Sequence, residues 1–205
     1  GEASPEQIAF EGRLATTLKN DQSLQWWRDA KRPVEWWQPI ASAEKSTGAK
    51  GGGAVKPGPV TAEAIAKAVA EQHAAGTLSL VICNTVDMAR DVFRALSTVD
   101  HSVLLTSRFR REDRARHEQR LLEFDTNRKA GELPKDDPGL ICVSTQVIEA
   151  GVDISAHRLW TELAPWPSLL QRFGRLNRKG DDQGGRAWVW ETTKEGGNRK
   201  VERIG

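Results

Sequence analysis

From residue 60 onward, short apolar runs alternate with helical patterns, and this alternation constrains the fold more than any other feature. The apolar runs have the length of strands that are buried on both faces, and they lie at residues 78–84, 102–106, 140–144, 158–163 and 186–191. Helices are expected from an N-cap at Thr61 to about residue 75, and at residues 86–96, 110–124, 146–149 and 168–174. This order predicts an α/β fold in which a parallel sheet carries helices on both faces.

Residues 1–59 lack the regular alternation of apolar runs and helical patterns seen in the rest of the chain. They contain two tryptophan pairs, Trp26-Trp27 and Trp36-Trp37, and end in a glycine- and proline-rich stretch at residues 41–59 that predicts a flexible loop. Tryptophan side chains favour burial, so the pairs are expected to pack on the following domain or on a neighbour outside this chain. We therefore predict a linker or extension at residues 1–59 and one α/β domain at residues 60–205.

The composition argues against several classes of protein. No apolar run approaches the ~18–20 residues that span a membrane, and no signal peptide is visible at the first residues. Cys83 and Cys142 lie inside apolar runs, as expected of buried thiols in a reducing compartment, and the cysteines and histidines show no zinc-binding spacing. The expectation is a cytoplasmic protein with no metal site of its own and no membrane partner.

Charge is distributed unevenly along the chain. The net charge is only +2, so it does not by itself indicate a nucleic-acid partner. Between residues 108 and 120, however, six arginines stand against three acidic residues, and a second basic cluster follows at residues 172–179. A run of this kind is typical of a solvated helix face, so charge alone leaves the question of a nucleic-acid partner open.

The octad Gln-Arg-Phe-Gly-Arg-Leu-Asn-Arg at residues 171–178 is the sharpest local motif. Arg172, Arg175 and Arg178 would share one helical face if a helix continued through the octad. Three guanidinium groups on one face repel one another unless they share an anion, and their planar donors match phosphate oxygens. The octad therefore predicts a polyphosphate site, with a solvated arginine face as the alternative.

A second motif, residues 144–154, begins where an apolar strand ends, and ligand loops leave the carboxyl ends of parallel strands. Ser144 and Thr145 would offer hydroxyl and N–H groups to a phosphate at a helix start. Asp153 could accept a ribose hydroxyl or pair with an arginine. An ordinary strand–turn–helix corner capped by Thr145 is the alternative.

In this order, the two motifs resemble motifs V and VI of superfamily 2 helicases, and residues 78–85 resemble motif IV. The chain is more closely similar to one family, the type I CRISPR-associated helicase-nuclease. The similar blocks are Asn84-Thr85-Val86, Ser107-Arg108-Phe109, residues 149–154 (Glu-Ala-Gly-Val-Asp-Ile) and residues 163–175 (Leu-Ala-Pro-Trp-Pro-Ser-Leu-Leu-Gln-Arg-Phe-Gly-Arg). Residues 18–34 also resemble the segment that follows the first motor domain of that family.

The resemblance implies a three-layer RecA-like domain, the second motor domain of an ATP-dependent DNA helicase or translocase of CRISPR interference. ATP and Mg²⁺ would be held mainly by a first RecA-like domain of the same protein. The other implied partners are single-stranded DNA and a CRISPR surveillance complex.

The resemblance also implies roles for individual residues. Arginine fingers that reach the γ-phosphate are matched by Arg175 and Arg178. Positions that contact the nucleotide or the cleft between the domains are matched by Gln171, Gly151 and Asp153. Positions that contact the DNA backbone are matched by Asn84, Thr85, Ser107, Arg108 and Thr145. Arg172 is expected to be structural and to pair within the domain.

The sequence lacks motifs that such a protein uses for hydrolysis. A P-loop ends in Gly-Lys-[Ser/Thr], and the dipeptide Gly-Lys does not occur in the 205 residues. An Asp-Glu-x-His box and a His-Asp pair, which would mark the magnesium site and the nuclease, do not occur either. We therefore expect this chain to be inactive alone, and an upstream P-loop in the reading frame would favour the motor.

Two other interpretations are open. One is a non-catalytic RecA-like module that binds nucleic acid or a partner, and the other is a different superfamily 2 enzyme such as a restriction-type translocase. The motor interpretation fails if Arg175 and Arg178 turn inward and are neutralised by acids of their own fold.

Overall fold

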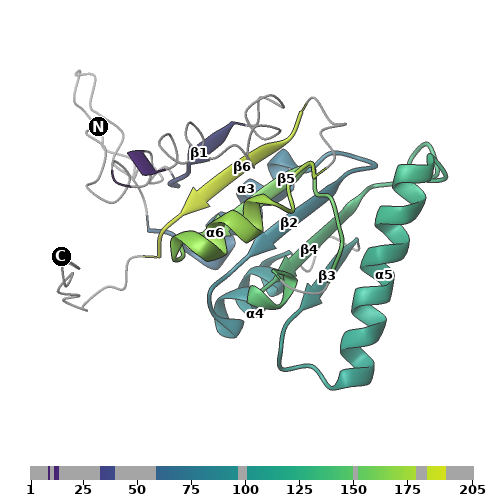
Figure 1. The fold of residues 1–205 in the computed structure, drawn as a ribbon, viewed down its shortest axis with the longest axis horizontal. Helices are drawn as coiled ribbons and strands as arrows, with labels where there is room; N and C mark the ends of the chain where they lie inside the picture. Colours follow the sequence, from purple (N-terminus) through teal and green to yellow (C-terminus); the bar gives the residue numbers. More distant parts are fainter. Residues whose placement is uncertain are drawn as a thin grey trace, which may run out of the picture.

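A six-stranded sheet forms the centre of the computed structural model, which describes residues 9, 12–13, 33–39, 59–96, 101–149, 152–178 and 184–192. The strand order is β1-β6-β5-β2-β4-β3, and each of these pairings is parallel (Figure 1). The strands are β1 (Val34–Trp36), β2 (Leu78–Ile82), β3 (Ser102–Leu105), β4 (Leu140–Ser144), β5 (Arg158–Glu162) and β6 (Arg186–Trp190).

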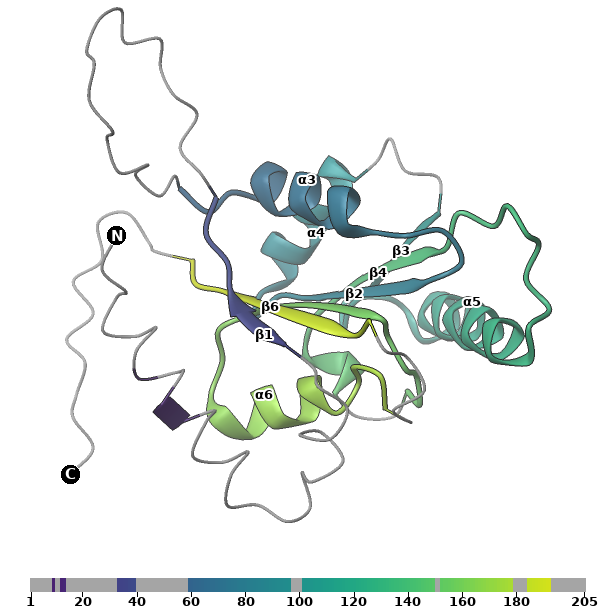
Figure 2. The same ribbon diagram turned by 90° about the horizontal axis from the view of Figure 1, so that it is seen from above.

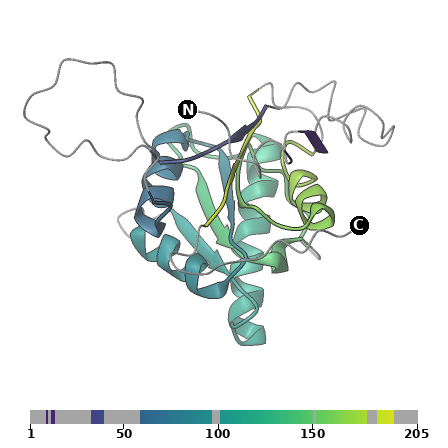
Figure 3. The same cartoon turned by 90° about the vertical axis from the view of Figure 1, so that its left-hand side faces the viewer.

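Helices cover both faces of the sheet. One face carries α3 (Ala62–Gln72) and α4 (Val86–Ala95), and the other carries α5 (Arg111–Ala130) and α6 (Trp166–Phe173), as Figure 2 shows from above and Figure 3 from the side. The central strands β2 and β4 are buried at every residue, because side chains on both of their faces meet a helical layer. The predicted α/β class, a three-layer RecA-like parallel sheet, is confirmed.

Capping side chains fix the starts of the two helices on the first face. The Thr61 hydroxyl accepts a hydrogen bond from the Ala64 N–H at 3.2 Å, and the Thr85 hydroxyl does the same for the Met88 N–H at 3.2 Å. The predicted N-cap at Thr61 is therefore confirmed, although α3 ends three residues earlier than expected.

On the second face, α5 runs six residues beyond its predicted end. It stops at Gly131, whose φ of +74° is the left-handed conformation that ends many helices. Between β4 and β5 the predicted short helix is the single 3₁₀ turn η2 (Gln146–Ile148).

Strand β1 lies inside the segment predicted to be an extension. It pairs with β6 from Val34↔Ala187 to Trp36↔Val189, and Trp37 then packs edge-on against Trp160 with ring centroids 5.5 Å apart. The pair Trp36-Trp37 thus packs on the following domain, one of the two predicted alternatives. The pair Trp26-Trp27 lies outside the described residues, and the division of the chain at residue 60 stays a prediction.

Both cysteines are buried and free, as their apolar neighbours predicted. Burial raises the pKa of the Cys142 thiol to about 12, so it stays protonated and packs as a small apolar side chain. Within the described part of the chain, no helix combines the length and the apolar character that crossing a membrane requires.

Candidate nucleotide and nucleic-acid site

The predicted nucleic-acid residues lie at the carboxyl edge of the sheet. Asn84 and Thr85 follow β2, Ser107 and Arg108 follow β3, and Thr145 follows β4. Because the strands are parallel, these three loops emerge at one edge, and Gln146 joins two of them by donating from its Nε2 to the Asn84 carbonyl at 3.2 Å.

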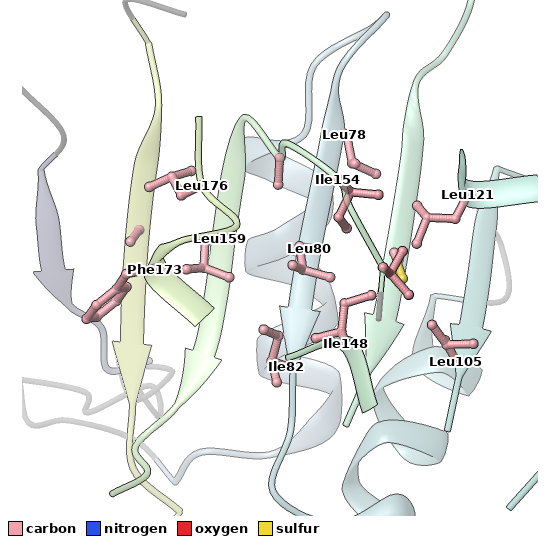
Figure 4. Close-up of a cluster of buried hydrophobic side chains, with 14 of the residues drawn as sticks. Leu78, Leu80, Ile82, Leu105, Leu121, Ile148, Ile154, Leu159, Phe173 and Leu176 are labelled. Atoms are coloured by element: carbon pink, nitrogen blue, oxygen red, sulfur yellow. The ribbon is translucent and has the colours of Figure 1, made fainter. Parts of the chain in front are cut away.

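A second group of predicted residues lies toward the opposite end of the sheet. We call residues 153–156 and 175–178 the loop pair. The N–H of His157, directly after the first segment, donates to the carbonyl of Leu78 at the amino end of β2 (2.8 Å). Figure 4 places Leu176 near the same end of the sheet as Leu78. The backbone of the loop pair therefore lies away from the carboxyl ends of the strands, where the sequence placed the ligand loops.

Arg172 is buried at the carboxyl edge, where its guanidinium group bonds several neighbouring residues. Its side chain is 1% exposed, and Nε donates to Glu149 Oε1 at 2.7 Å. Its other nitrogens donate at 3.0 Å to Thr161 Oγ1, the Glu162 carbonyl and Asn84 Oδ1. A buried charge needs this degree of pairing, so the prediction that Arg172 is structural is confirmed.

Asn84 is the partner that links this centre to the loop after β5. Its Nδ2 donates to the Leu163 carbonyl at 2.7 Å, and its backbone N–H donates to Glu162 Oε2 at 2.7 Å. Both ends of its amide group are therefore engaged within the domain, one by Arg172 and one by Leu163. In this arrangement the Asn84 side chain positions the edge, and its predicted contact with DNA stays a prediction.

The octad does not place three arginines on one helical face. Helix α6 ends at Phe173 with Gly174 as its C-cap, so Arg175 and Arg178 lie beyond the helix while Arg172 points into the core. The predicted shared face is wrong because it assumed that the helix continued through the octad.

Arg175 and Arg178 are instead brought together in the loop pair with Asp153. Arg175 is half-buried, and its Nη2 donates to the Glu149 carbonyl at 2.8 Å. Its Nε is buried and has no hydrogen-bond partner among the described residues. Burial is the main cause that lowers the pKa of Arg175, the positive charge of Arg178 adds to it, and the negative charge of Asp153 opposes it.

Arg178 is the more exposed of the two arginines in the loop pair. Its Nη1 pairs with Asp153 Oδ1, so in this structure Asp153 has an arginine partner, one of the two roles that the sequence left open for it. The two side chains are 48% and 78% exposed, so this pair lies at the surface. Arg178 is thus paired with an acid of its own fold but is not turned inward, and the printed partner of the half-buried Arg175 is a carbonyl, so the full condition that would refute the motor interpretation is not met.

Backbone bonds hold the two segments of the loop pair together. The Ala156 N–H donates to the Arg175 carbonyl at 2.8 Å, and the Asn177 N–H donates to the Ala156 carbonyl at 2.7 Å. The Arg178 N–H donates to Ser155 Oγ at 2.9 Å. The backbone that carries both arginines is thus fixed, although the Arg178 side chain is exposed.

The remaining predicted residues differ in accessibility. Thr85, Ser107 and Arg108 are exposed. Ser144 and Thr145 are buried, at 0% and 1% exposure, so their hydroxyls do not form the predicted surface for a phosphate. The Ser144 hydroxyl donates to the Leu105 carbonyl at 2.8 Å, and the Thr145 side chain makes no capping bond.

Of the predicted nucleotide contacts at Gln171 and Gly151, the structure describes only the first. Gln171 is exposed on α6, and Gly151 lies outside the described residues. Among the residues that the structure places, no group of three or more His, Cys, Asp or Glu side chains could hold a metal ion.

Four residues of the site were not identified from the sequence: Glu149, Glu162, Ser155 and Arg128. Glu149 belongs to a block that carries the family resemblance, which is a usable signal. The other three act through partners 10 or more positions away in the chain, and no spacing in the sequence indicates such contacts.

The fold and the arginine-bearing loops define a RecA-like helicase domain. Residues 75–181, just over half of the chain, match the family described as CRISPR-associated nuclease/helicase Cas3, C-terminal. The chain therefore belongs to this family.

Similar proteins extend the comparison. The chain is 34% identical over 120 residues to a putative CRISPR-associated nuclease/helicase Cas3 from Methanocaldococcus jannaschii, a match that covers 58% of this chain and 16% of the relative. It is 33% identical over 108 residues to the CRISPR-associated endonuclease/helicase Cas3 of Escherichia coli, covering 51% and 12%. The chain thus spans less than a fifth of the length of these two relatives.

Solved structures show the same fold. The crystal structure of T. fusca Cas3-ATP superposes with a TM-score of 0.58 at 22% identity, covering 80% of this chain and 19% of that one. A chain of a structure described as a CRISPR RNA-guided surveillance complex, pre-nicking, has a TM-score of 0.53 at 22% identity, and the match covers 80% of this chain and 19% of that one.

Proposed function

We propose that this domain is the second RecA-like motor domain of an ATP-dependent DNA helicase or translocase of CRISPR interference, with Arg175 and Arg178 as its arginine fingers. The observation that carries the proposal is the state of these two guanidinium groups. Their backbone is fixed, but Arg178 is exposed and Arg175 keeps a buried Nε without a partner among the described residues.

The two arginines fit a polyphosphate in charge and in donor geometry. Guanidinium groups donate to phosphate oxygens in pairs, and charge builds up on the transferred phosphoryl group in the transition state. Arg178 would exchange its bond to Asp153 for the γ-phosphate. The loss is small, because an exposed ion pair contributes only about 0.2–1 kcal/mol.

An arginine finger contributes far more than the ion pair that it leaves. Such a group accelerates phosphoryl transfer by about 10³–10⁵-fold, which corresponds to roughly 4–7 kcal/mol of barrier. Asp153, once released, would be available to a ribose hydroxyl, and Gln171 and Gly151 would contact the nucleotide.

The donors of the loop pair suit an anion and not a cation, so the P-loop and the Mg²⁺ ligands would come from another RecA-like domain of the whole protein. Mg²⁺ would neutralise charge on the phosphates. The residues of this chain would close the site from the other side. The names of the similar proteins support this assignment, since one of the superposed structures is described as an ATP complex.

The carboxyl edge would contact the sugar-phosphate backbone of single-stranded DNA. The exposure of Thr85, Ser107 and Arg108 supports direct contacts by these side chains. Asn84 and Thr145 would contribute by holding the edge in place, since their side chains are engaged or buried. Contacts to phosphate carry no sequence information, so movement along DNA would be largely independent of sequence.

The whole protein would act in the cytoplasm with a CRISPR surveillance complex as its partner, by analogy with a structure described as such a complex. A non-catalytic RecA-like module remains the second candidate. The paired, preorganised Arg175 and Arg178 favour the motor, because a domain without motor activity has no need of phosphate ligands in this arrangement.

The test is the replacement Arg178→Ala in the full-length protein. ATP turnover is expected to fall by about 10³-fold or more, while binding of single-stranded DNA is retained. Arg94→Ala is the matched control, because Arg94 is also an exposed arginine paired with an aspartate, Asp91. Wild-type turnover by Arg178→Ala would refute the finger assignment.

A further inference from the structure

Helix α5 contacts the loop pair through a buried ion pair that none of the assigned roles uses. Asp125 is 2% exposed and accepts from Arg128 Nη2 at 2.6 Å and from Lys129 Nζ at 2.5 Å. Most of α5 is polar and solvated, so a carboxylate at this depth with two cationic partners needs an explanation.

Arg128 extends this ion pair to the loop pair. The same Nη2 that bonds Asp125 also donates to the Ser155 carbonyl at 2.9 Å, and Nη1 lies 3.1 Å from His157 Nε2. The Arg128 side chain is 15% exposed, so these contacts lie mostly out of water. Arg128 therefore fastens one segment of the loop pair to α5.

The segment 175–178 is linked to Arg128 through Ser155. Ser155 accepts from Arg128 with its carbonyl and from the Arg178 N–H with its hydroxyl, at 2.9 Å in each case. Two hydrogen bonds thus separate the Arg128 guanidinium from the backbone of Arg178. A third residue, Asp153, lies two positions before Ser155 and holds the Arg178 side chain.

We propose that Arg128, oriented by Asp125, is a positioning residue that sets the place of Arg178 through Ser155. The proposal rests on the proposed function of Arg178 as an arginine finger. A finger must reach the transferred phosphoryl group within a fraction of an ångström, and a displacement of about 1 Å can lower a rate by about 100-fold. The exposed side chain of Arg178 has little packing of its own, so the positioning must come through its backbone.

Lys129 offers a matched control variant, because it is the second cation that pairs with Asp125. It pairs with the same buried carboxylate as Arg128, but no bond from Lys129 to Ser155 is described. Lys129→Ala removes a cation from Asp125 and leaves the link to the loop pair intact. Arg128→Lys does the reverse, because it keeps a positive charge beside Asp125 and loses the fork that reaches Ser155.

The experiment measures steady-state ATP hydrolysis by the full-length protein carrying Arg128→Ala, Arg128→Lys, Lys129→Ala or Arg178→Ala. We expect kcat to fall about 10- to 100-fold in both Arg128 variants. KM for ATP should change little, because a finger acts mainly in the transition state. Lys129→Ala should keep wild-type kcat. Arg128→Lys keeps the test valid if Arg128→Ala does not fold.

The outcomes separate the two proposals. If Arg178→Ala loses turnover while both folded Arg128 variants match Lys129→Ala, the positioning role is overturned and the finger assignment stands. If Arg178→Ala keeps wild-type turnover, the proposed function itself fails. A fall in kcat for Arg128→Lys that disappears in the Arg178→Ala background, measured by single-turnover hydrolysis, supports the proposal, since residues that act as a unit are not additive.

Discussion

The two ends of the sheet use arginines of one octad in opposite ways. At the carboxyl edge, Arg172 is buried and donates to four groups, two on strand β5 and one in each of the loops after β2 and β4. In the loop pair, Arg178 is half-exposed and its side chain pairs with a more exposed aspartate. The comparison teaches that a buried and satisfied guanidinium builds the site, while an exposed guanidinium on a fixed backbone remains available to a ligand.

Replacing each arginine by alanine tests most directly whether Arg172 and Arg178 have different roles. Arg172→Ala leaves Glu149 without its cation at 11% exposure, so the free energy of unfolding should fall by about 3–5 kcal/mol. Arg178→Ala removes an exposed pair and should cost less than about 1 kcal/mol. Urea unfolding of the 205-residue chain measures both, and equal losses would contradict the division of roles.

Thr85 sharpens the comparison at the carboxyl edge, because it both caps α4 and lies among the predicted DNA contacts. Thr85→Ala and Thr61→Ala each remove a cap of 3.2 Å, so each should lower stability by about 1 kcal/mol. Only Thr85→Ala should also weaken binding of single-stranded DNA by the full-length protein. A loss of DNA affinity that is the same for both variants would assign Thr85 to capping alone.

His73, which contacts Ser79 near the amino end of β2, makes the stability of the fold sensitive to acid. The Pro138 carbonyl accepts from His73 Nε2 at 3.0 Å, so Nδ1, 2.7 Å from the Ser79 hydroxyl, is the acceptor in the neutral ring. Burial is the main cause that lowers the pKa of His73, with added repulsion from His101 and Arg158.

Because its pKa is lowered in the folded state, His73 makes the chain less stable in acid. The unfolded chain binds a proton at about pH 6.5 and the folded chain only at a lower pH, so stability is full above pH 6.5 and declines as the pH falls below it. Thermal unfolding of the wild-type chain and of His73→Gln between pH 7.5 and 5 should show a steeper decline for the wild type. Parallel declines would mean that other groups account for the acid sensitivity.

How much of this structure the sequence predicts depends on whether the information is local. The run at residues 140–144 coincides with β4, and the Thr61 cap is where the pattern placed it. Strand β1 was missed because three residues are too few to show alternation, and its pairing with β6 depends on residues more than 150 positions away.

For the candidate site, too, the sequence predicts local features better than contacts between distant residues. The octad identified the arginines, but the shared face required a helix that continues past Gly174, the glycine at which the sequence pattern and the structure both end α6. The resemblance to a helicase-nuclease family correctly marked Arg172 as structural. Its partner Asn84 lies 88 positions away, in the loop after β2, and only the packed sheet brings the two together.

The central claim is that the arginines of this chain complete a nucleotide site whose P-loop lies elsewhere in the protein. Its most direct test is the rate of ATP hydrolysis by the 205-residue chain alone and by the full-length protein, each with and without single-stranded DNA. We predict no turnover above background for the 205-residue chain and DNA-stimulated turnover for the full-length protein. Robust hydrolysis by the 205-residue chain alone would contradict the claim.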